Sequence, residues 1–402
     1  MKLSDLCFFV LEKTDIDTLN LHTYISTENM LPDKRGVTKA TSLPTISKVN
    51  AYKDNDILVS NIRPYFKKIW KAMYCGGCSN DVLVFRTTSK CYSGFLYYVL
   101  SDDRFFNYAT GTSKGTKMPR GDKVAIMEYQ VPDVPLDDQY KIASVLSALD
   151  SKIIQNTEIN NNLEQQAQAL FRSWFIDFEP FGGTMPDDWE ERALTDIPYF
   201  TLLKPGISSF DGEKYYVATA DADEDGITNK TTFVTMQNKP SRANMQPLVD
   251  SVWFAKMKNS RKNILINELW TEEIHKFILS TGFYGFACQP NTLYFLWCFV
   301  ASDAFDELKN NLCNGTTMEA INNDGLGQIA LTVPPLEIIQ KFNDTVSAMF
   351  KQISQNKFEN ERLAAIRDAL LPKLMSGEID VSKVDISDPG CLDKSLFNKE
   401  TE

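Results

Sequence analysis

Two long segments without glycine or proline stand out in the pattern of apolar and polar positions, from Leu136 to Glu179 and from Leu336 to Leu371. In both, apolar residues recur at alternating steps of three and four. The mean spacing of about 3.5 residues is typical of coiled-coil helices. The apolar positions are Ile142, Leu146, Leu149, Ile153, Leu163, Ala167, Leu170 and Trp174 in the first stripe, and Phe342, Val346, Met349, Ile353, Leu363, Leu370 and Leu374 in the second. We therefore predict long spacer helices in residues 134–180 and 334–377.

Asparagine interrupts both stripes at matching positions, with Asn156 and Asn160 in the first and Asn356 and Asn360 in the second. Arg367 is the one charged residue in either stripe. One interpretation is that the asparagines are polar residues tolerated on a loosely packed face. The other is that the helices pack antiparallel about a pseudo-two-fold axis, so that the asparagines meet and fix the register, as buried Asn does in coiled coils. We favour the second, because a long spacer needs a fixed register.

The matching positions belong to an internal repeat with an offset of 200 residues. Residues 135–174 align without gaps on residues 335–374 with 12 identities in 40 positions. Ordinary composition gives about 6% identity by chance, so the match is specific. Upstream, Gly115 and Met118 lie on Gly315 and Met318 at the same offset. The sequence therefore predicts a duplication of one plan.

Each copy begins with short β-like runs, such as residues 57–59, 81–85 and 292–296, separated by turn residues such as Gly76-Gly77. We predict an α+β fold. It comprises two mixed α/β globular domains, residues 1–133 and 185–332, separated by the two long antiparallel coiled-coil-like helices. An acidic tail follows in residues 378–402.

Composition narrows the class of protein. Hydrophobic residues make up 43% and aromatic residues 11% of the 402 residues, which excludes a disordered chain. The first residues do not resemble a signal peptide, and the eight cysteines have irregular spacing, so we expect free thiols in the cytoplasm. The net charge of −11 is unevenly distributed, because residues 1–133 carry +4 and residues 185–332 carry −8.

Catalytic and metal motifs are weak throughout the sequence. We find no phosphate-binding loop with a conserved Lys-Ser/Thr ending, no His-Glu-x-x-His helix and no amino-methyltransferase tetrapeptide. Ser113 lies in a Gly-x-Ser-x-Gly match, but the following residues cannot start a helix. Cys75 and Cys78 have zinc-knuckle spacing without a second ligand pair, and we expect a hairpin turn there. We therefore expect no catalytic residue and no metal in this chain.

Positive charge gathers in short loops of both globular domains, interleaved with aromatic residues, Asn, Ser and Thr. Lys and Arg in such loops hold phosphates, while Asn and Arg read base edges, so the loops favour DNA binding. The alternative is that they are solvated edge turns that prevent strand aggregation. We expect that removing the charges of Lys67 and Lys68 weakens DNA binding and reduces its dependence on salt. The candidate DNA-binding residues are Arg63, Lys67, Lys68, Lys114, Lys117, Arg120, Lys256, Lys258, Arg261, Lys262, Asn314 and Thr316.

The chain resembles the specificity subunits of type I restriction-modification systems along essentially its whole length. The most specific part is the segment from Pro135-Leu136-Asp137-Asp138-Gln139 to Trp174-Phe175-Ile176-Asp177-Phe178, which is similar to the central spacer helix of that family. The segments 24–29 and 56–65, the opening 185–189 and the closing 377–380 also resemble the family. The start of the second long helix departs from the family pattern. Its glutamine, Gln340, lies one residue later than Gln139 does in the first helix when the two are aligned at the offset of 200.

The resemblance implies two target-recognition domains, each binding one half of a bipartite double-stranded DNA target. The helices would set the spacing and dock methyltransferase subunits, expected to number two, and restriction subunits would complete the complex. S-adenosylmethionine, ATP and Mg would then belong to the partner subunits. Two alternatives stay open: a two-headed scaffold without specific DNA recognition, favoured by the acidic second domain, and a self-sufficient enzyme.

Overall fold

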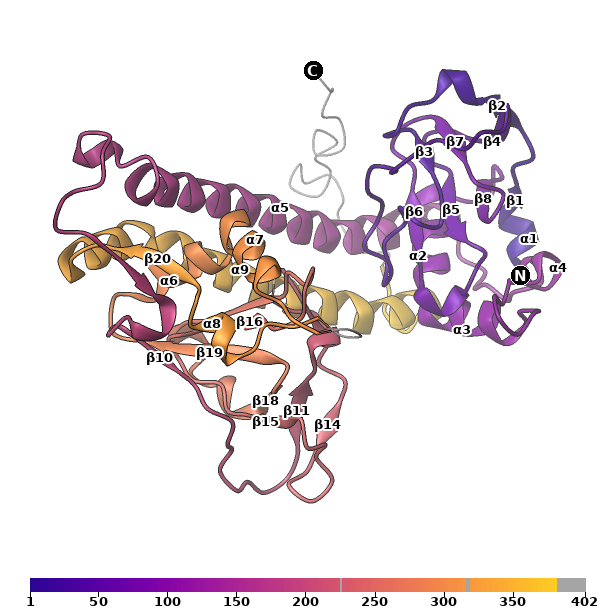
Figure 1. Cartoon of the computed structure of the whole chain (residues 1–402). Helices are drawn as coiled ribbons and strands as arrows, with labels where there is room; N and C mark the ends of the chain where they lie inside the picture. The colour runs from indigo at the N-terminus through magenta and orange to yellow at the C-terminus, as the bar shows by residue number, and fades with distance from the viewer. Residues whose placement is uncertain (225, 316–318, 382–402) are drawn as a thin grey trace. The chain divides into compact units, whose positions relative to one another are not determined.

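The computed structural model describes residues 1–224, 226–315 and 319–381, and its fold mixes helices and strands (Figure 1). It divides into two units, of which the first is built from two separate stretches of the chain and the second from one. The first unit comprises Met1–Gln155 and the chain from Asn360 on, and the second comprises Asn156–Glu359. Both long helices, α5 (Leu136–Phe175) and α9 (Leu336–Ser376), therefore contribute one part to each unit.

The first unit contains two four-stranded sheets, in the orders β1-β8-β5-β6 and β2-β4-β7-β3. The β3–β7 pair is parallel and the other pairs are antiparallel. Its strands are β1 (Cys7–Phe9), β2 (Lys13–Asp15), β3 (Tyr24–Ile25), β4 (Lys48–Tyr52), β5 (Ile57–Ser60), β6 (Ile69–Lys71), β7 (Gly76–Cys78) and β8 (Val82–Thr87). Its short helices are α1 (Leu3–Leu6), α2 (Ser93–Ser101), α3 (Asp103–Gly111) and α4 (Lys123–Met127).

The second unit contains two further four-stranded sheets, β10-β19-β16-β17 and β14-β11-β18-β15, and two small two-stranded sheets, β12-β13 and β20-β9. The parallel pair here is β11–β18. Its strands are β9 (Glu190–Ala193), β10 (Phe200–Leu202), β11 (Lys214–Val217), β12 (Ala222–Asp223), β13 (Gly226–Ile227), β14 (Phe233–Val234), β15 (Ala243–Met245), β16 (Ser251–Ala255), β17 (Asn263–Ile266), β18 (Phe277–Ser280), β19 (Phe283–Cys288) and β20 (Ala330–Val333). Its short helices are α6 (Leu293–Val300), α7 (Asp303–Asn311) and α8 (Asn323–Leu326).

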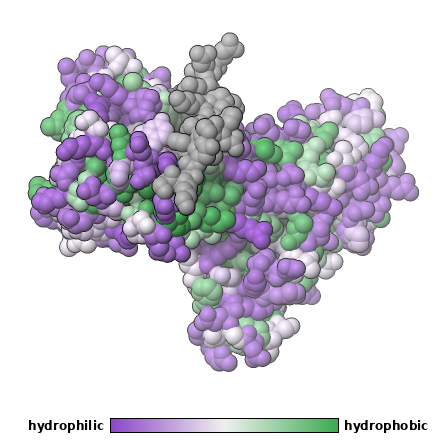
Figure 2. All heavy atoms as spheres, turned by 180° about the vertical axis from the view of Figure 1, so that it is seen from behind, coloured by the Kyte–Doolittle hydropathy of each residue, from purple (hydrophilic) through white to green (hydrophobic). Residues whose placement is uncertain are grey.

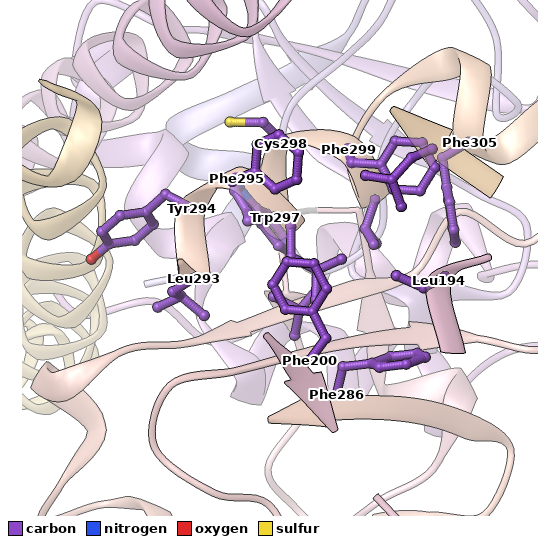
Figure 3. Close-up of a cluster of buried hydrophobic side chains, with 14 of the residues drawn as sticks. Leu194, Phe200, Phe286, Leu293, Tyr294, Phe295, Trp297, Cys298, Phe299 and Phe305 are labelled. Carbon is purple, nitrogen blue, oxygen red and sulfur yellow. The ribbon is translucent and has the colours of Figure 1, made fainter. Parts of the chain in front are cut away.

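The segment 292–296 was expected to be β-like, and this prediction is wrong, because residues Leu293–Val300 form helix α6. All eight residues of α6 are buried, so no polar face marks the helical period in the sequence. Figure 3 shows side chains of α6, including that of Phe295, above Phe200 and Phe286 of the sheet. On the other side Tyr294 stacks on Phe350 of α9, with ring centroids 4.9 Å apart. The helix is thus enclosed between a sheet and α9.

Gly76 and Gly77 were expected to make a hairpin turn, and this prediction is also wrong, because both belong to strand β7. A Cβ atom at Gly76 would lie 2.3 Å from the Thr23 carbonyl oxygen, and one at Gly77 would lie 2.6 Å from Val49. Glycine is required here by the close approach of neighbouring chain, not by a turn. The runs around residues 57–59 and 81–85 form β5 and β8, as predicted.

The core of the first unit uses the first part of α5 and the last part of α9. Ile142 and Leu146 are buried together with Leu371, Leu374 and Met375. Arg367, the charged residue of the apolar stripe, pairs with Asp150 at 2.7 Å, and Asp150 also accepts a hydrogen bond of 2.6 Å from the Tyr98 hydroxyl. The charge is accommodated because its partner lies on the facing helix.

The core of the second unit uses the complementary parts of the same helices. Phe171 and Phe175 of α5 pack on Phe342 of α9, with ring centroids 5.9 and 5.0 Å apart.

Polar side chains cover much of the face of the molecule in Figure 2, with apolar residues interspersed. None of the helices within the described ranges combines the length and apolar composition needed to cross a bilayer.

Candidate nucleic-acid interface

Two basic loops of the first unit lie next to each other. The β5–β6 loop, residues 61–68, and the loop between α3 and α4, residues 112–122, are joined by the backbone bridge between Ile62 and Arg120. The Arg63 amide donates to the Pro119 carbonyl at 2.8 Å, which extends this contact. The sequence predicted two separate basic clusters, and the fold brings them together.

The second loop closes on itself through a short hairpin. Lys114 and Arg120 exchange two backbone hydrogen bonds of 2.8 and 2.9 Å. Gly115 has φ 98°, a backbone conformation that other residues rarely adopt, which explains the glycine at this turn. Residues 115–119 therefore project as a compact turn. The helix α3 before this loop shows that Ser113 does not lie on a strand-to-helix elbow, and its Oγ donates to the Thr110 carbonyl at 2.7 Å.

The second unit has two loops joined by the same backbone contacts. Asn314 and Ala320 lie 200 positions after Lys114 and Arg120, whereas Met257 lies 195 positions after Ile62. Met257 and Ala320 form a backbone bridge, the Lys258 amide donates to the Glu319 carbonyl at 3.0 Å, and Asn314 exchanges two hydrogen bonds of 3.1 Å with Ala320. Thr316 lies outside the described residues. The candidate residues of this domain thus occupy the positions that correspond to those of the first.

Lys68 and Lys262 make equivalent internal contacts. The Nζ of Lys68 donates to the Thr27 carbonyl at 2.7 Å, and the Nζ of Lys262 donates to the Thr219 carbonyl at 2.6 Å. Both lysines are half-buried, and burial lowers the pKa of Lys68. These two cations hold their loops to the chain after β3 and β11, which favours a structural role for them.

Lys67 and Arg261 also make equivalent contacts, in this case with the first residue of a helix. Lys67 pairs with Asp103 of α3 at 2.8 Å, and Arg261 pairs with Asp303 of α7 at 2.5 Å. Asp103 receives a second ion pair of 2.8 Å from Lys34. Although burial alone raises the pKa of Asp103, the hydrogen bonds from Lys34 and Lys67 lower it overall. An ion pair therefore fixes the β5–β6 loop to the first residue of α3, and another fixes the loop before β17 to the first residue of α7.

Lys34 was not identified from the sequence as a candidate. It lies 33 positions before Lys67 in the sequence, but its amide donates to the Lys67 carbonyl at 2.9 Å. The adjacent Asp33 amide donates to the Phe66 carbonyl, also at 2.9 Å. The only local indication was the Lys34-Arg35 pair after the Pro32-Asp33 turn, which does not reveal its spatial partner.

The most exposed cations of the first unit lie on the 112–122 loop. The side chain of Lys114 is 80% exposed and pairs with Asp122 at 2.5 Å. This contact, with the hydrogen bonds Asp122 accepts as the cap of α4, lowers the pKa of Asp122. Arg120 is 53% exposed and pairs with Asp81 at 3.1 Å. Lys117 is exposed and makes no ion pair with any described residue. Because these side chains are exposed, Lys114 and Arg120 can leave their carboxylate partners and bind DNA phosphates without disturbing the fold.

The cations of the second unit are more strongly compensated. Lys256 lies over the Tyr284 ring at 3.9 Å, and burial lowers its pKa. Lys258 pairs with Glu319 at 2.9 Å, while Arg261 has Glu224 3.9 Å away as well as Asp303. This compensation follows the acidity of residues 185–332, and it predicts weaker phosphate attraction by the second loops.

The asparagines of the long helices lie at helix–helix contacts within the units, three in the second and one in the first. The Asn356 amide donates to the Asn160 carbonyl at 2.8 Å, and the Asn156 amide donates to the Glu359 carboxylate at 2.7 Å. In the first unit, the Asn360 amide lies 3.5 Å from the Ile153 carbonyl. As the residue number rises along α5, the number of its partner on α9 falls, from Glu359 to Asn356 in the second unit. Within each unit the helices are therefore antiparallel.

Two of the buried cysteine thiols are held in their protonated form. Burial raises the pKa of Cys91 to about 12 and raises the pKa of Cys298 well above its ordinary value, so these thiols stay protonated at neutral pH. Within the described part of the chain, no three His, Cys, Asp or Glu side chains lie together in a way that could hold a metal ion. The arrangement is one of positioned cations and amides, which can bind a polyanion.

Comparison with known proteins agrees with the sequence resemblance. Residues 16–165 match the family model described as "Type I restriction modification DNA specificity domain". The chain is 27% identical over 318 residues to the type I restriction enzyme MjaIX specificity subunit of Methanocaldococcus jannaschii, covering 73% of this chain and 70% of that protein. It is 24% identical over 324 residues to the HindI specificity subunit of Haemophilus influenzae, covering 64% of this chain and 70% of that protein. The crystal structure of a type I restriction-modification S subunit from M. genitalium shares the fold, with a TM-score of 0.50, 16% identity and 93% and 95% of the two chains covered.

Proposed function

We propose that this chain, which is similar to specificity subunits of type I restriction enzymes, is the DNA sequence-recognition component of such a complex. Each globular domain, residues 1–133 and 185–332, would bind one half of a bipartite double-stranded target. The observation that carries the proposal is that the same backbone contacts join two loops in each unit. Both loops are basic in the first unit, whereas one is basic and the other polar in the second.

The loops carry side chains of the kinds that contact DNA phosphates and side chains of the kinds that recognise bases. In the first unit, Lys114, Lys117 and Arg120 supply exposed cations beside Arg63. In the second, Asn314 offers an amide that can bind a base edge. We propose the other candidate residues of both units as the DNA-contacting set, while Lys68 and Lys262 would hold the loops in shape through their carbonyl contacts.

We infer that the two units arose by duplication and that the asparagines of α5 and α9 fix the register of the helices. Support comes from the equivalent backbone contacts of the loops, from the equivalent Lys67–Asp103 and Arg261–Asp303 pairs, and from the Asn356–Asn160 bond. A fixed register would keep the two half-sites at a constant spacing, as dimer geometry does for other DNA-binding proteins.

Methylation and cleavage would belong to partner subunits. Methyltransferase subunits, two in number, would dock on the spacer helices, and restriction subunits would join them. S-adenosylmethionine, ATP and Mg would be bound by those partners. The chain itself would act through binding alone, which agrees with the names of its relatives as specificity subunits.

The test is single-molecule methylome sequencing of a host that expresses this chain with its methyltransferase subunit. We expect one bipartite motif, methylated on adenine, that disappears when this chain is deleted. The reconstituted complex should then protect the motif in a DNA titration. Protection that does not depend on sequence would instead support the scaffold hypothesis, which the acidic second domain favours.

A further inference from the structure

An exposed aromatic pair lies at the tip of the β5–β6 loop. Tyr65 and Phe66 are 47% and 39% exposed, and their ring centroids are 4.8 Å apart. Two adjacent exposed aromatic side chains on a loop are typical of a contact surface, because their apolar area gains free energy only when a partner covers it. The proposed phosphate-binding cations do not account for this pair.

The backbone presents the pair in a fixed conformation. Residues Pro64–Phe66 form one 3-10 turn, and the residues on either side, Arg63 and Lys67, have φ of 49° and 51°. Left-handed conformations in residues other than glycine are costly and persist where surrounding contacts enforce them, often at functional sites. Here the enforcing contacts include the amides of Asp33 and Lys34 on the Phe66 and Lys67 carbonyls. Binding therefore requires little further ordering of the loop.

Positive charge surrounds the pair. Lys34 and Lys67 share the Asp103 carboxylate, and the Lys68 ammonium lies 5.9 Å from the Phe66 ring centroid. Aromatic rings flanked by cations match a partner with flat π-systems bordered by phosphates, which is the chemistry of nucleic-acid bases on their backbone. A protein partner would have to be strongly acidic to cover the same surface.

We propose that Tyr65 and Phe66 act as an aromatic wedge that stacks on bases of the first half-site and unstacks one base step. The inference rests on the proposed function and extends it, because it assigns deformation of the DNA to this chain. Apolar and aromatic side chains inserted between base pairs open a step and bend the duplex, and sequences differ in the cost of this change. The wedge therefore contributes to target choice without hydrogen bonds to base edges.

The wedge belongs to one half of the target only. The corresponding loop of the second unit runs from Lys258 to Lys262 and has Asn259 and Ser260 between its cations, without an aromatic residue. Two halves of similar plan would thus use different means of recognition, with deformation in the first half-site and polar contacts in the second.

The experiment uses the full-length chain, reconstituted with its methyltransferase subunits, and duplexes that carry the target motif with 2-aminopurine at successive positions of each half-site. The wild-type complex should raise the fluorescence at one step of the first half-site. The Tyr65→Ala, Phe66→Ala double variant should abolish this rise and lower the affinity about tenfold, with an unchanged dependence on salt because no charge is removed. A matched control is Phe233→Ala, which removes a 50% exposed aromatic residue outside the loops and should change neither quantity.

The signal of the base that a methyltransferase extrudes serves as an internal reference, because it should persist in the variant. If the complex binds its motif selectively but no other step is unstacked, or if the double variant keeps the unstacked step, the wedge is refuted while the proposed function stands. Absence of any selective binding refutes both. A double variant that fails to assemble with the methyltransferase places the pair at a protein contact and also refutes the wedge. If the double variant does not fold, Tyr65→Ser and Phe66→Ser are each expected to weaken the signal, and an undiminished signal in both overturns the proposal.

Discussion

The contacts of the lysines predict which of them contribute to the salt dependence of DNA binding. Lys117 is exposed without an ion pair to any described residue, whereas the Nζ of Lys68 donates to the Thr27 carbonyl at 2.7 Å. Each phosphate contact contributes about 0.9 to the slope of log K against log salt. We therefore expect Lys117→Gln to lower the magnitude of this slope by about 0.9. If variant and wild type bind equally at about 1 M salt, the variant then binds roughly fivefold more weakly than the wild type at about 0.15 M.

Lys68→Met should behave differently, because it removes an internal hydrogen bond and leaves a carbonyl without its donor. We expect a loss of about 1 kcal/mol in the free energy of unfolding and a nearly unchanged salt slope. The assay is fluorescence anisotropy of the reconstituted complex with a labelled target duplex at five salt concentrations, with urea denaturation of each variant. An unchanged slope for Lys117→Gln together with a reduced slope for Lys68→Met would refute the assignment.

Three further outcomes concern the helices and the sheet. Asn356→Leu should lower the free energy of unfolding by about 1–3 kcal/mol by removing the bond to Asn160, while the double replacement of both by Leu should be nearly neutral; urea denaturation measures both. Arg367→Met should cost about 1–3 kcal/mol, because its carboxylate partner is only 22% exposed, and the same titration compares it with exposed Arg172→Met as control. Gly285→Ala should lower the melting temperature by several degrees, since its Cβ would lie 2.4 Å from the Trp253 indole; an unchanged value would contradict this packing.

The regular parts of the fold could be predicted from sequence because their patterns were long. The stripe from Ile142 and the stripe from Phe342 indicated α5 and α9, and the structure gives them the bounds Leu136–Phe175 and Leu336–Ser376. Helix α6 was missed for the opposite reason. It is short and buried on every side, so that neither a helical period nor an alternation was present. Gly76-Gly77 was misassigned because a glycine required by packing looks like a glycine required by a turn.

The candidate site was predictable in composition but not in role. Basic residues in loops could be counted from the sequence, yet nothing in Lys67-Lys68 told which ammonium group faces a carboxylate and which a carbonyl oxygen. That distinction depends on contacts with Asp103 and Thr27, which are distant along the chain. The contribution of Lys34 was hidden in the same way, because it reaches the loop through tertiary contacts only.

The composition of the first unit has a consequence for how the protein is synthesised. Its core includes Leu371, Leu374 and Met375, so the part of the apolar face around Ile142 and Leu146 that these residues cover stays exposed until the ribosome has completed nearly the whole chain. At about 5–20 residues per second, the wait for some 200 further residues lasts roughly 10–40 seconds. During that interval the first part of α5 exposes an apolar surface that favours aggregation. Chains interrupted before Asn360 should therefore aggregate or be degraded, and a host would lose recognition of both half-sites together.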